Sequence, residues 1–249
     1  MHASSLAALT RAPLEATPMN LFKSQAFSRV APFIVFMAFI GLEQGMRVLL
    51  ERQVLDFEAA ALNWLYFPKA VLVGLLLWLL RKRYTEINRR ELLDYRQTAL
   101  SIISGLLVFA LWINMNWTLG SQGDPAGFDP GVFSTEAGKW LMILVRISGA
   151  VIIVPIMEEL FWRSFLLRYL IDSDFTRVAI GRFSLFSFIA VSILFGLEHH
   201  YVFAGIMAGV VFNGIYYFTR SIVHCILSHA VANLSLAAYV LNTGNWNFW

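Results

Sequence analysis

The amino-acid sequence predicts an all-α protein, a polytopic transmembrane bundle of about seven or eight helices. Composition is the first reason, because 58% of the 249 residues are hydrophobic and only 14% are charged, whereas soluble domains are about 45–50% apolar and about 25% charged. The second reason is that the apolar residues form long runs, near the roughly 20 residues that a membrane-spanning helix needs. The third is that basic and acidic loops alternate between these runs, as they do in multi-pass membrane proteins.

Seven apolar runs are candidate spans: residues 30–50, 60–80, 98–119, 138–171, 183–199, 201–218 and 221–242. The fourth run is too long for one simple span. We expect it to tilt, to end in an interfacial turn, or to break near Pro155 and so provide an eighth element. The fifth and sixth runs are short and nearly adjacent, which indicates a tight turn or a re-entrant element.

The chain is expected to form a single transmembrane domain, residues 29–249, after an N-terminal segment, residues 1–28. That segment is mixed and polar, and it lacks the compact apolar stretch and the cleavage site of a removable signal peptide. We expect a cytoplasmic tail or an interfacial segment there. The single cysteine, Cys225, excludes an internal disulfide and a cysteine-rich metal site.

Basic residues gather in alternate loops. Loop 81–97 carries six of them and further arginines follow the fourth and sixth runs, whereas loops 51–59 and 120–137 carry mostly acids. Lysine and arginine favour cytoplasmic loops, so the pattern predicts a cytoplasmic N-terminus. With seven spans, the C-terminal "NTGNWNFW" then lies on the outer side, where its tryptophans suit the membrane interface.

Two adjacent carboxylates lie inside the fourth apolar run, in the segment "VPIMEELFWR". Ionisable groups within spans are rare and indicate function by default. Glu159 and Arg163 are four residues apart, so we expect them to form an ion pair on one helix face. Glu158 points about 100° away and has no evident partner. An unpaired carboxylate in an apolar site holds its proton more tightly, which suits it to act as a base near neutral pH.

Histidines follow on the later spans. His199 lies four residues after Phe195, and Cys225, His229 and Asn233 share a face at steps of four. At about 1.5 Å per residue, Glu158 and these polar side chains all fall near the middle of an about 30 Å hydrocarbon core. The spacing therefore allows one buried constellation of a carboxylate, two imidazoles and an amide. Glu198 is expected to point elsewhere on its helix.

Other ionisable residues in the spans have structural interpretations. Glu43 and Arg47 are four residues apart and are expected to pair with each other. Lys69 and Arg146 are expected to extend towards the membrane surface or to neutralise a carboxylate.

The motifs Glu158-Glu159-x-x-x-Arg163, Phe195-x-x-x-His199 and His229-x-x-x-Asn233 occur in this order. They resemble the CPBP family, the CAAX-protease and bacteriocin-processing (Abi-type) membrane proteins, over a core of about residues 138–242. One departure is Ser164, where a glycine often follows the arginine. The segment "VPIMEELFWRSFLLRYLI" is also similar to that of a bacterial subgroup that accompanies exosortase systems. This similarity implies a bacterial inner-membrane location and exosortase-system partners.

The resemblance implies an intramembrane glutamate protease that hydrolyses a peptide bond of a membrane-anchored protein or peptide. In that role Glu158 is the general base, and His199 holds or polarises the attacking water. His229 and Asn233 donate to the oxyanion, while Glu159 and Arg163 orient the helix and tune Glu158. The bilayer is the surrounding medium, and no cofactor, metal or nucleic acid is expected.

Three alternatives stay open at this point. Glu158, His199, His200 and His229 could bind zinc through nitrogen and oxygen atoms, although no HExxH motif is present. A non-catalytic immunity or binding protein of the same fold would use the cavity to hold a peptide or lipid. A proton-coupled transporter would also bury Glu and His, but it predicts inverted repeats, which the sequence does not display.

Overall fold

The computed structural model describes residues 24–115, 117 and 127–249. In these residues the elements are helices and loops without any strand, which confirms the all-α prediction. Most of the predicted N-terminal segment, residues 1–23, lies outside the described residues, as does the first part of the acidic loop 120–137. The first helix begins at Gln25, ahead of the predicted start of the first span at residue 30.

Six helical stretches are long and apolar enough to cross a membrane: α1 (Gln25–Glu51), α2 with its flanking 3₁₀ turns (Ala59–Arg83, with α2 proper at Tyr66–Leu80), α3 (Tyr95–Trp112), the long helix Glu136–Tyr169, α8 (Val202–Thr219) and α9 (Ile222–Thr243). A seventh apolar helix, α7 (Leu185–Leu197), is shorter. This set agrees with the predicted seven or eight. The third span ends at Trp112 rather than 119, and Asn114 then donates its side-chain amide back to the Ala110 carbonyl at 2.7 Å.

The long helix runs through α4 (Glu136–Ser148), α5 (Val154–Glu159) and α6 (Leu167–Tyr169), which are joined by two π-helical stretches, Gly149–Ile153 and Leu160–Leu166. It does not break near Pro155. Instead, the Val154 amide reaches the Gly149 carbonyl five residues back, and the wider π turn accommodates the proline without ending the helix. The eighth element that a break would have produced is therefore not formed at this place.

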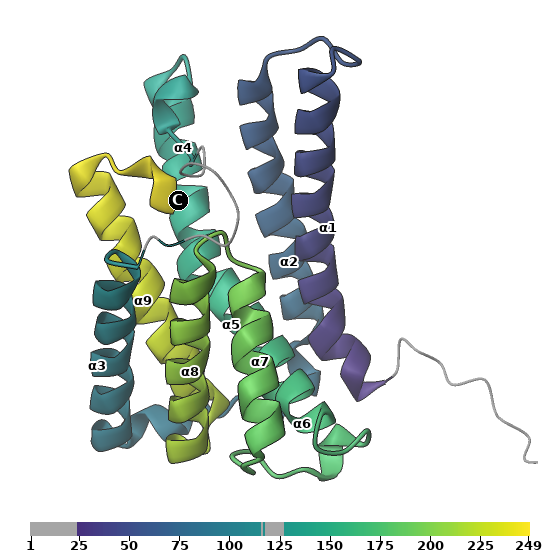
Figure 1. The fold of residues 1–249 in the computed structure, drawn as a ribbon, viewed down its shortest axis with the longest axis vertical. Helices are drawn as coiled ribbons and strands as arrows, with labels where there is room; N and C mark the ends of the chain where they lie inside the picture. The colour runs from purple at the N-terminus through teal and green to yellow at the C-terminus, as the bar shows by residue number, and fades with distance from the viewer. Residues whose placement is uncertain (1–23, 116, 118–126) are drawn as a thin grey trace, which may run out of the picture.

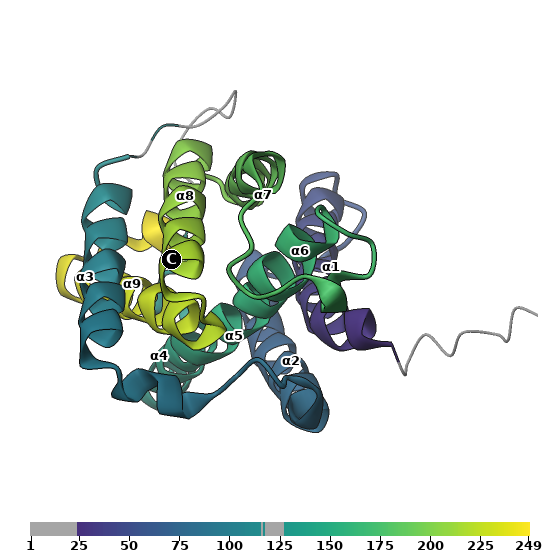
Figure 2. The same cartoon turned by 90° about the horizontal axis from the view of Figure 1, so that it is seen from below.

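The long helix passes between two groups of helices (Figure 1, Figure 2). On one side α1 and α2 form an antiparallel pair, which contacts both π-helical stretches. On the other side α3, α8 and α9 pack together, and α7 lies along α8. The long helix therefore contacts the elements that carry the other predicted site residues.

The contact between α7 and α8 is made through small residues. A Cβ on Gly205 would lie 2.8 Å from the Gly196 Cα, and one on Gly209 would lie 3.0 Å from the Ser192 Cα. Small residues let membrane helices approach this closely. A tight turn at residues 198–201 joins the two helices, which is the first of the two expected alternatives, a tight turn or a re-entrant element. At its other end, α7 begins where the Ser184 hydroxyl accepts from the Ser187 amide.

Basic residues gather at the end of the bundle where α1 and α3 begin and α8 ends, which we call the basic end (lower end in Figure 1). Its members come from the segment after α2 and from the loops around α7: Arg81, Lys82, Arg83, Arg89, Arg90, Arg96, Arg177, Arg182 and Arg220. The loop clustering predicted from the sequence is thus present in the fold.

Candidate active site

The predicted ion pair between Glu159 and Arg163 is confirmed. Arg163 Nη1 donates to Glu159 Oε1 at 3.0 Å, and both side chains are fully buried. The arginine Nε also donates to Asn213 Oδ1 on α8 at 3.1 Å. The guanidinium lies over the Phe195 ring, with 4.6 Å between its central carbon and the ring centroid. The charge of Arg163 is therefore balanced by an acid, an amide and an aromatic face, as a charge in an apolar interior requires.

Asn213 is a site-supporting residue that the motifs do not contain. Its amide nitrogen donates to Ser192 Oγ at 3.0 Å on α7, while its oxygen accepts from Arg163. The amide thus ties the long helix to α7 through α8. The available signal in the sequence was an asparagine inside an apolar helix, which needs a hydrogen-bond partner in lipid.

His229 is held by Glu159. Its Nδ1 lies 3.0 Å from Glu159 Oε1, and because a carboxylate only accepts, the ring nitrogen is the donor. Nε2, on the opposite side of the ring, lies 4.0 Å from Glu158 Oε2. The Phe212 ring stacks on the imidazole at 4.8 Å between centroids. One acid therefore orients the imidazole towards the other acid.

Glu158 is buried, and its Oε2 forms no hydrogen bond within the described part of the chain. Its carboxylate lines a cavity of about 190 Å³, together with His199, His229 and Asn233. Such a volume has room for several water molecules, each of which needs polar partners. Two neighbouring acids of the same type thus have different surroundings, because the helix directs Glu159 towards Arg163 and Glu158 towards the cavity.

The backbone fixes which nitrogen of His199 carries the hydrogen. Its Nδ1 lies 2.7 Å from the Phe195 carbonyl, which only accepts, so Nδ1 carries the hydrogen. The neutral ring then has its lone pair on Nε2. Trp112 on α3 packs edge-on against the imidazole, with ring centroids 5.2 Å apart, and helps to fix its plane.

The expectation that Glu198 points away from the site is wrong. Ligand atoms of Glu158, Glu198 and His199 all lie within 4.8 Å of one another. The reason is that α7 ends at Leu197, so the rotation of about 100° per residue used for the prediction does not apply to Glu198. The side chain also accepts a hydrogen bond from Trp162 Nε1 at 3.1 Å. The adjacent "EHH" letters were the only sequence signal for this residue.

Asn233 connects α9 to the π turn at Pro155. The Asn233 amide donates to the Ala150 carbonyl at 2.8 Å. In a π turn this carbonyl would accept from residue 155, but a proline has no N–H. The carbonyl is therefore free to accept across the helix interface. The amide nitrogen carries a second hydrogen that remains to donate, and Asn233 also lines the cavity.

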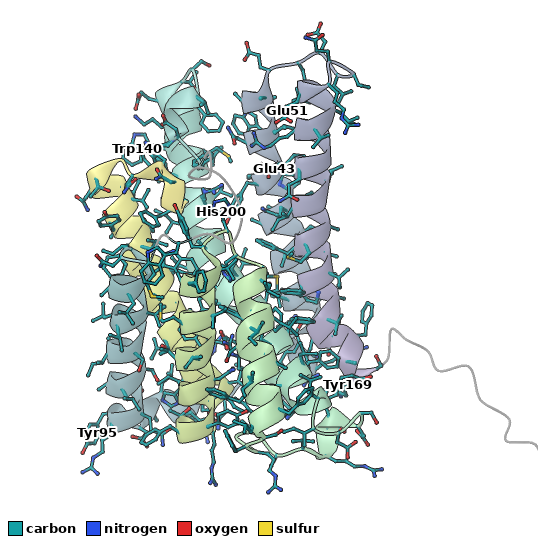
Figure 3. All side chains as sticks on the ribbon, in the orientation of Figure 1. Glu43, Glu51, Tyr95, Trp140, Tyr169 and His200 are labelled. Atoms are coloured by element: carbon teal, nitrogen blue, oxygen red, sulfur yellow. The ribbon has the colours of Figure 1, made fainter. Side chains whose placement is uncertain are left out.

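Other predicted residues lie apart from the site. His200 is exposed and is not part of the three-residue group, so the zinc ligand set proposed from the sequence is not assembled (Figure 3). Glu43 and Arg47 pair at 2.8 Å, as expected. Lys69 and Arg146 make no ion pair within the described residues; instead their cations lie 4.7 and 4.9 Å from the Tyr66 ring centroid. Among the described residues, Glu158, Glu198 and His199 are grouped closely enough to hold a metal.

The model of the "Type II CAAX prenyl endopeptidase Rce1-like" family matches residues 136–235. This region runs from the start of α4 into α9 and contains all three motifs. This region is similar to the Rce1-like family, which confirms the predicted resemblance. No curated protein and no solved structure matches the chain. The matched family is that of CAAX-type intramembrane proteases, which act on membrane-embedded peptides or proteins. The exosortase link and the domain boundaries stay predictions.

The buried pair between Glu159 and Arg163 generates a prediction about stability. In Arg163→Met the Glu159 carboxylate loses a buried counter-charge, and we expect a loss of about 3–5 kcal/mol. The double variant Glu159→Gln/Arg163→Met should recover part of that loss, since no uncompensated charge is left. Thermal unfolding of the purified protein in detergent measures both.

The matched control is the pair of Glu43 and Arg47, whose side chains are 28% and 38% exposed. Arg47→Met should change the free energy of unfolding by less than about 1 kcal/mol. Equal destabilisation by Arg163→Met and Arg47→Met would contradict the buried-charge account.

Proposed function

We propose that the protein is a glutamate-dependent intramembrane endopeptidase that cleaves a membrane-anchored protein or peptide. The observation that carries the proposal is Glu158, a buried carboxylate that borders a cavity with room for several waters, lined also by two histidines and an asparagine. The Rce1-like family supplies the class of reaction, and the geometry supports a water-activating acid within it.

Glu158 takes a proton from the attacking water, and the oxygen of that water adds to the carbonyl carbon of the scissile peptide bond. The same proton then passes to the leaving nitrogen as the carbon–nitrogen bond breaks, so Glu158 is regenerated. The product termini are a carboxylate and an amine. This cycle needs no group beyond those that the chain supplies.

The water is held by Glu158, Glu198 and His199. Their ligand atoms lie within 4.8 Å of one another, a separation that one water molecule bridges. These contacts aim a lone pair of the water at the substrate. Glu198 is added here to the residues predicted from the motifs.

His229 and Asn233 donate to the oxyanion that forms on the substrate. Donors of this kind contribute about 3–4 kcal/mol each to transition-state stabilisation. His229 serves in its doubly protonated form, with Nδ1 on Glu159 and Nε2 towards the cavity. Asn233 uses the amide hydrogen that Ala150 leaves free. Glu159 and Arg163 position these groups and do not touch the substrate.

The protein works as a multi-pass membrane protein with the bilayer around it. We place the basic end in the cytoplasm of a bacterial cell, because lysine and arginine favour cytoplasmic loops. Since α1 begins at this end, the N-terminus is cytoplasmic in this proposal.

Glu158→Gln tests the proposed base. The amide keeps the size of the side chain but cannot take a proton, so we expect turnover to fall by about 100-fold or more. Proteomic mapping of peptide termini, in membranes of cells that express either form, should find membrane peptides whose new termini occur only with the unchanged protein.

Glu43→Gln is the control, because it removes an acid of α1 that lies outside the cavity. It should leave every such terminus in place. If the Glu158→Gln protein produces the same termini as the unchanged protein, the proposed base is wrong and a non-catalytic immunity or binding role is favoured.

Glu198→Gln tests the residue that the motifs missed. The amide oxygen still accepts from Trp162, so folding should be retained, but an amide replaces the carboxyl group that holds the water. With a peptide identified by terminus mapping, kcat should fall about tenfold while KM stays unchanged. Trp162→Phe removes the donor to Glu198 but leaves the acid in place, so kcat should change much less. A rise in KM alone in Glu198→Gln would instead indicate a role in substrate binding.

A zinc-dependent protease is the second candidate, because Glu158, Glu198 and His199 form a compact group of oxygen and nitrogen ligands. The metal-free reaction predicts that cleavage persists after prolonged incubation with a chelator. Loss of cleavage, restored by added zinc and not by magnesium, would establish the metal-dependent form.

A further inference from the structure

A second pocket lies at the basic end and shares no lining residue with the active-site cavity. Its volume is about 510 Å³, within the about 300–1,000 Å³ of small-ligand sites. The polar side chains that line it come from α1, the segment after α2, α6 and the loop before α7: Gln25, Arg29, Thr85, Glu86, Arg168 and Thr176. This pocket has no part in the proposed hydrolysis.

Two of the lining residues are buried arginines. Arg29 is 4% exposed and Arg168 is 7% exposed. Both guanidinium groups lie over the same Phe175 ring, with 5.5 Å and 5.0 Å between their central carbons and its centroid. Placing two cations in one poorly solvated corner is unfavourable unless anions balance them.

Only one of the two cations is balanced. Glu86 holds Arg29 through two parallel hydrogen bonds, of 2.9 Å from Nε and 2.7 Å from Nη2. Arg168 donates from Nε to the Ser164 carbonyl at 2.7 Å. Among the described residues no carboxylate forms an ion pair with Arg168. The two arginines and one glutamate that line the pocket therefore leave one positive charge without a partner anion.

The place of the pocket indicates where an anion would come from. The pocket lies where α1 begins, just after the span Ala59–Arg83 ends, and where the long helix ends. Because these helices are long enough to cross a membrane, their ends lie at the level of the membrane surface. Figure 3 shows Tyr169, the neighbour of Arg168, at the same end of the bundle as Tyr95. Arg81, Lys82 and Arg83 lie close by in the chain and add to the positive potential.

We infer that this pocket binds the phosphate group of an anionic phospholipid at the membrane surface. The planar fork of Arg168 matches two phosphate oxygens, and the Thr85 hydroxyl can donate to the same group. Basic pockets between membrane helices bind lipid headgroups in this way. A bound phosphate would balance the Arg168 charge and join α1 to the end of the long helix.

The test measures lipid binding to the full chain, purified in detergent, by native mass spectrometry. Phosphatidylglycerol is compared with phosphatidylcholine of the same acyl chains, and inorganic phosphate is added in a separate arm that reads the melting temperature. We expect phosphatidylglycerol to bind at least about tenfold more tightly than phosphatidylcholine. Arg168→Met should remove most of that difference, because a charged hydrogen-bond partner is lost.

Arg96→Met is the matched control, since it removes an exposed arginine from the same end of the bundle without touching the pocket. It should leave the preference for phosphatidylglycerol unchanged. Arg168→Lys keeps the charge but not the fork, so intermediate binding is expected and the test survives if Arg168→Met does not fold.

Two results would overturn the inference: equal binding of both lipids by the unchanged protein, or an undiminished preference in both Arg168 variants. If inorganic phosphate raises the melting temperature through Arg168 while the lipids bind equally, the site takes phosphate from solution and the lipid source is wrong. Because every arm reads binding or melting, the outcome is independent of whether Glu158 cleaves peptides.

Discussion

The structure depends on one constraint, the burial of the Arg163 charge in the middle of a membrane-spanning bundle. The guanidinium has no exposed surface, so each of its contacts must replace the water that it has lost. Glu159 provides the opposite charge, Asn213 provides an oxygen from α8, and Phe195 provides a ring face from α7. These partners lie on three helices and are satisfied together only in one relative register, so the requirement of one side chain aligns the helices that carry the site.

The same constraint separates the roles of the two adjacent acids. Glu159 shares one oxygen between Arg163 and His229, and thereby fixes the imidazole on α9. Glu158, one residue earlier, is turned by the helix into the cavity, which Glu159 does not line in the described structure. The ion pair stabilises the scaffold, and Glu158 at the cavity is left available for chemistry.

The long helix also connects the cavity with the basic end. Ser164, which stands where the family pattern often has glycine, hydrogen-bonds to Glu86 and accepts from Arg29 at 3.2 Å. A glycine has no hydroxyl and could make neither contact. The departure noted in the sequence therefore removes no reactive group and adds a polar link between the helix of the two acids and the phosphate pocket that we propose.

The sequence by itself determined the class of fold, the approximate spans, the charge distribution and the pair of Glu159 and Arg163, because these follow from hydrophobic length, loop composition and residues four apart on one helix. Only the tertiary structure decided the place of Glu198, since the helix ends before it and local periodicity no longer applies. The same is true of Asn213, of the contact between Asn233 and Ala150, and of the Arg168 pocket. Each of them joins segments far apart in the chain, and such contacts arise from packing between helices, which a local pattern does not encode.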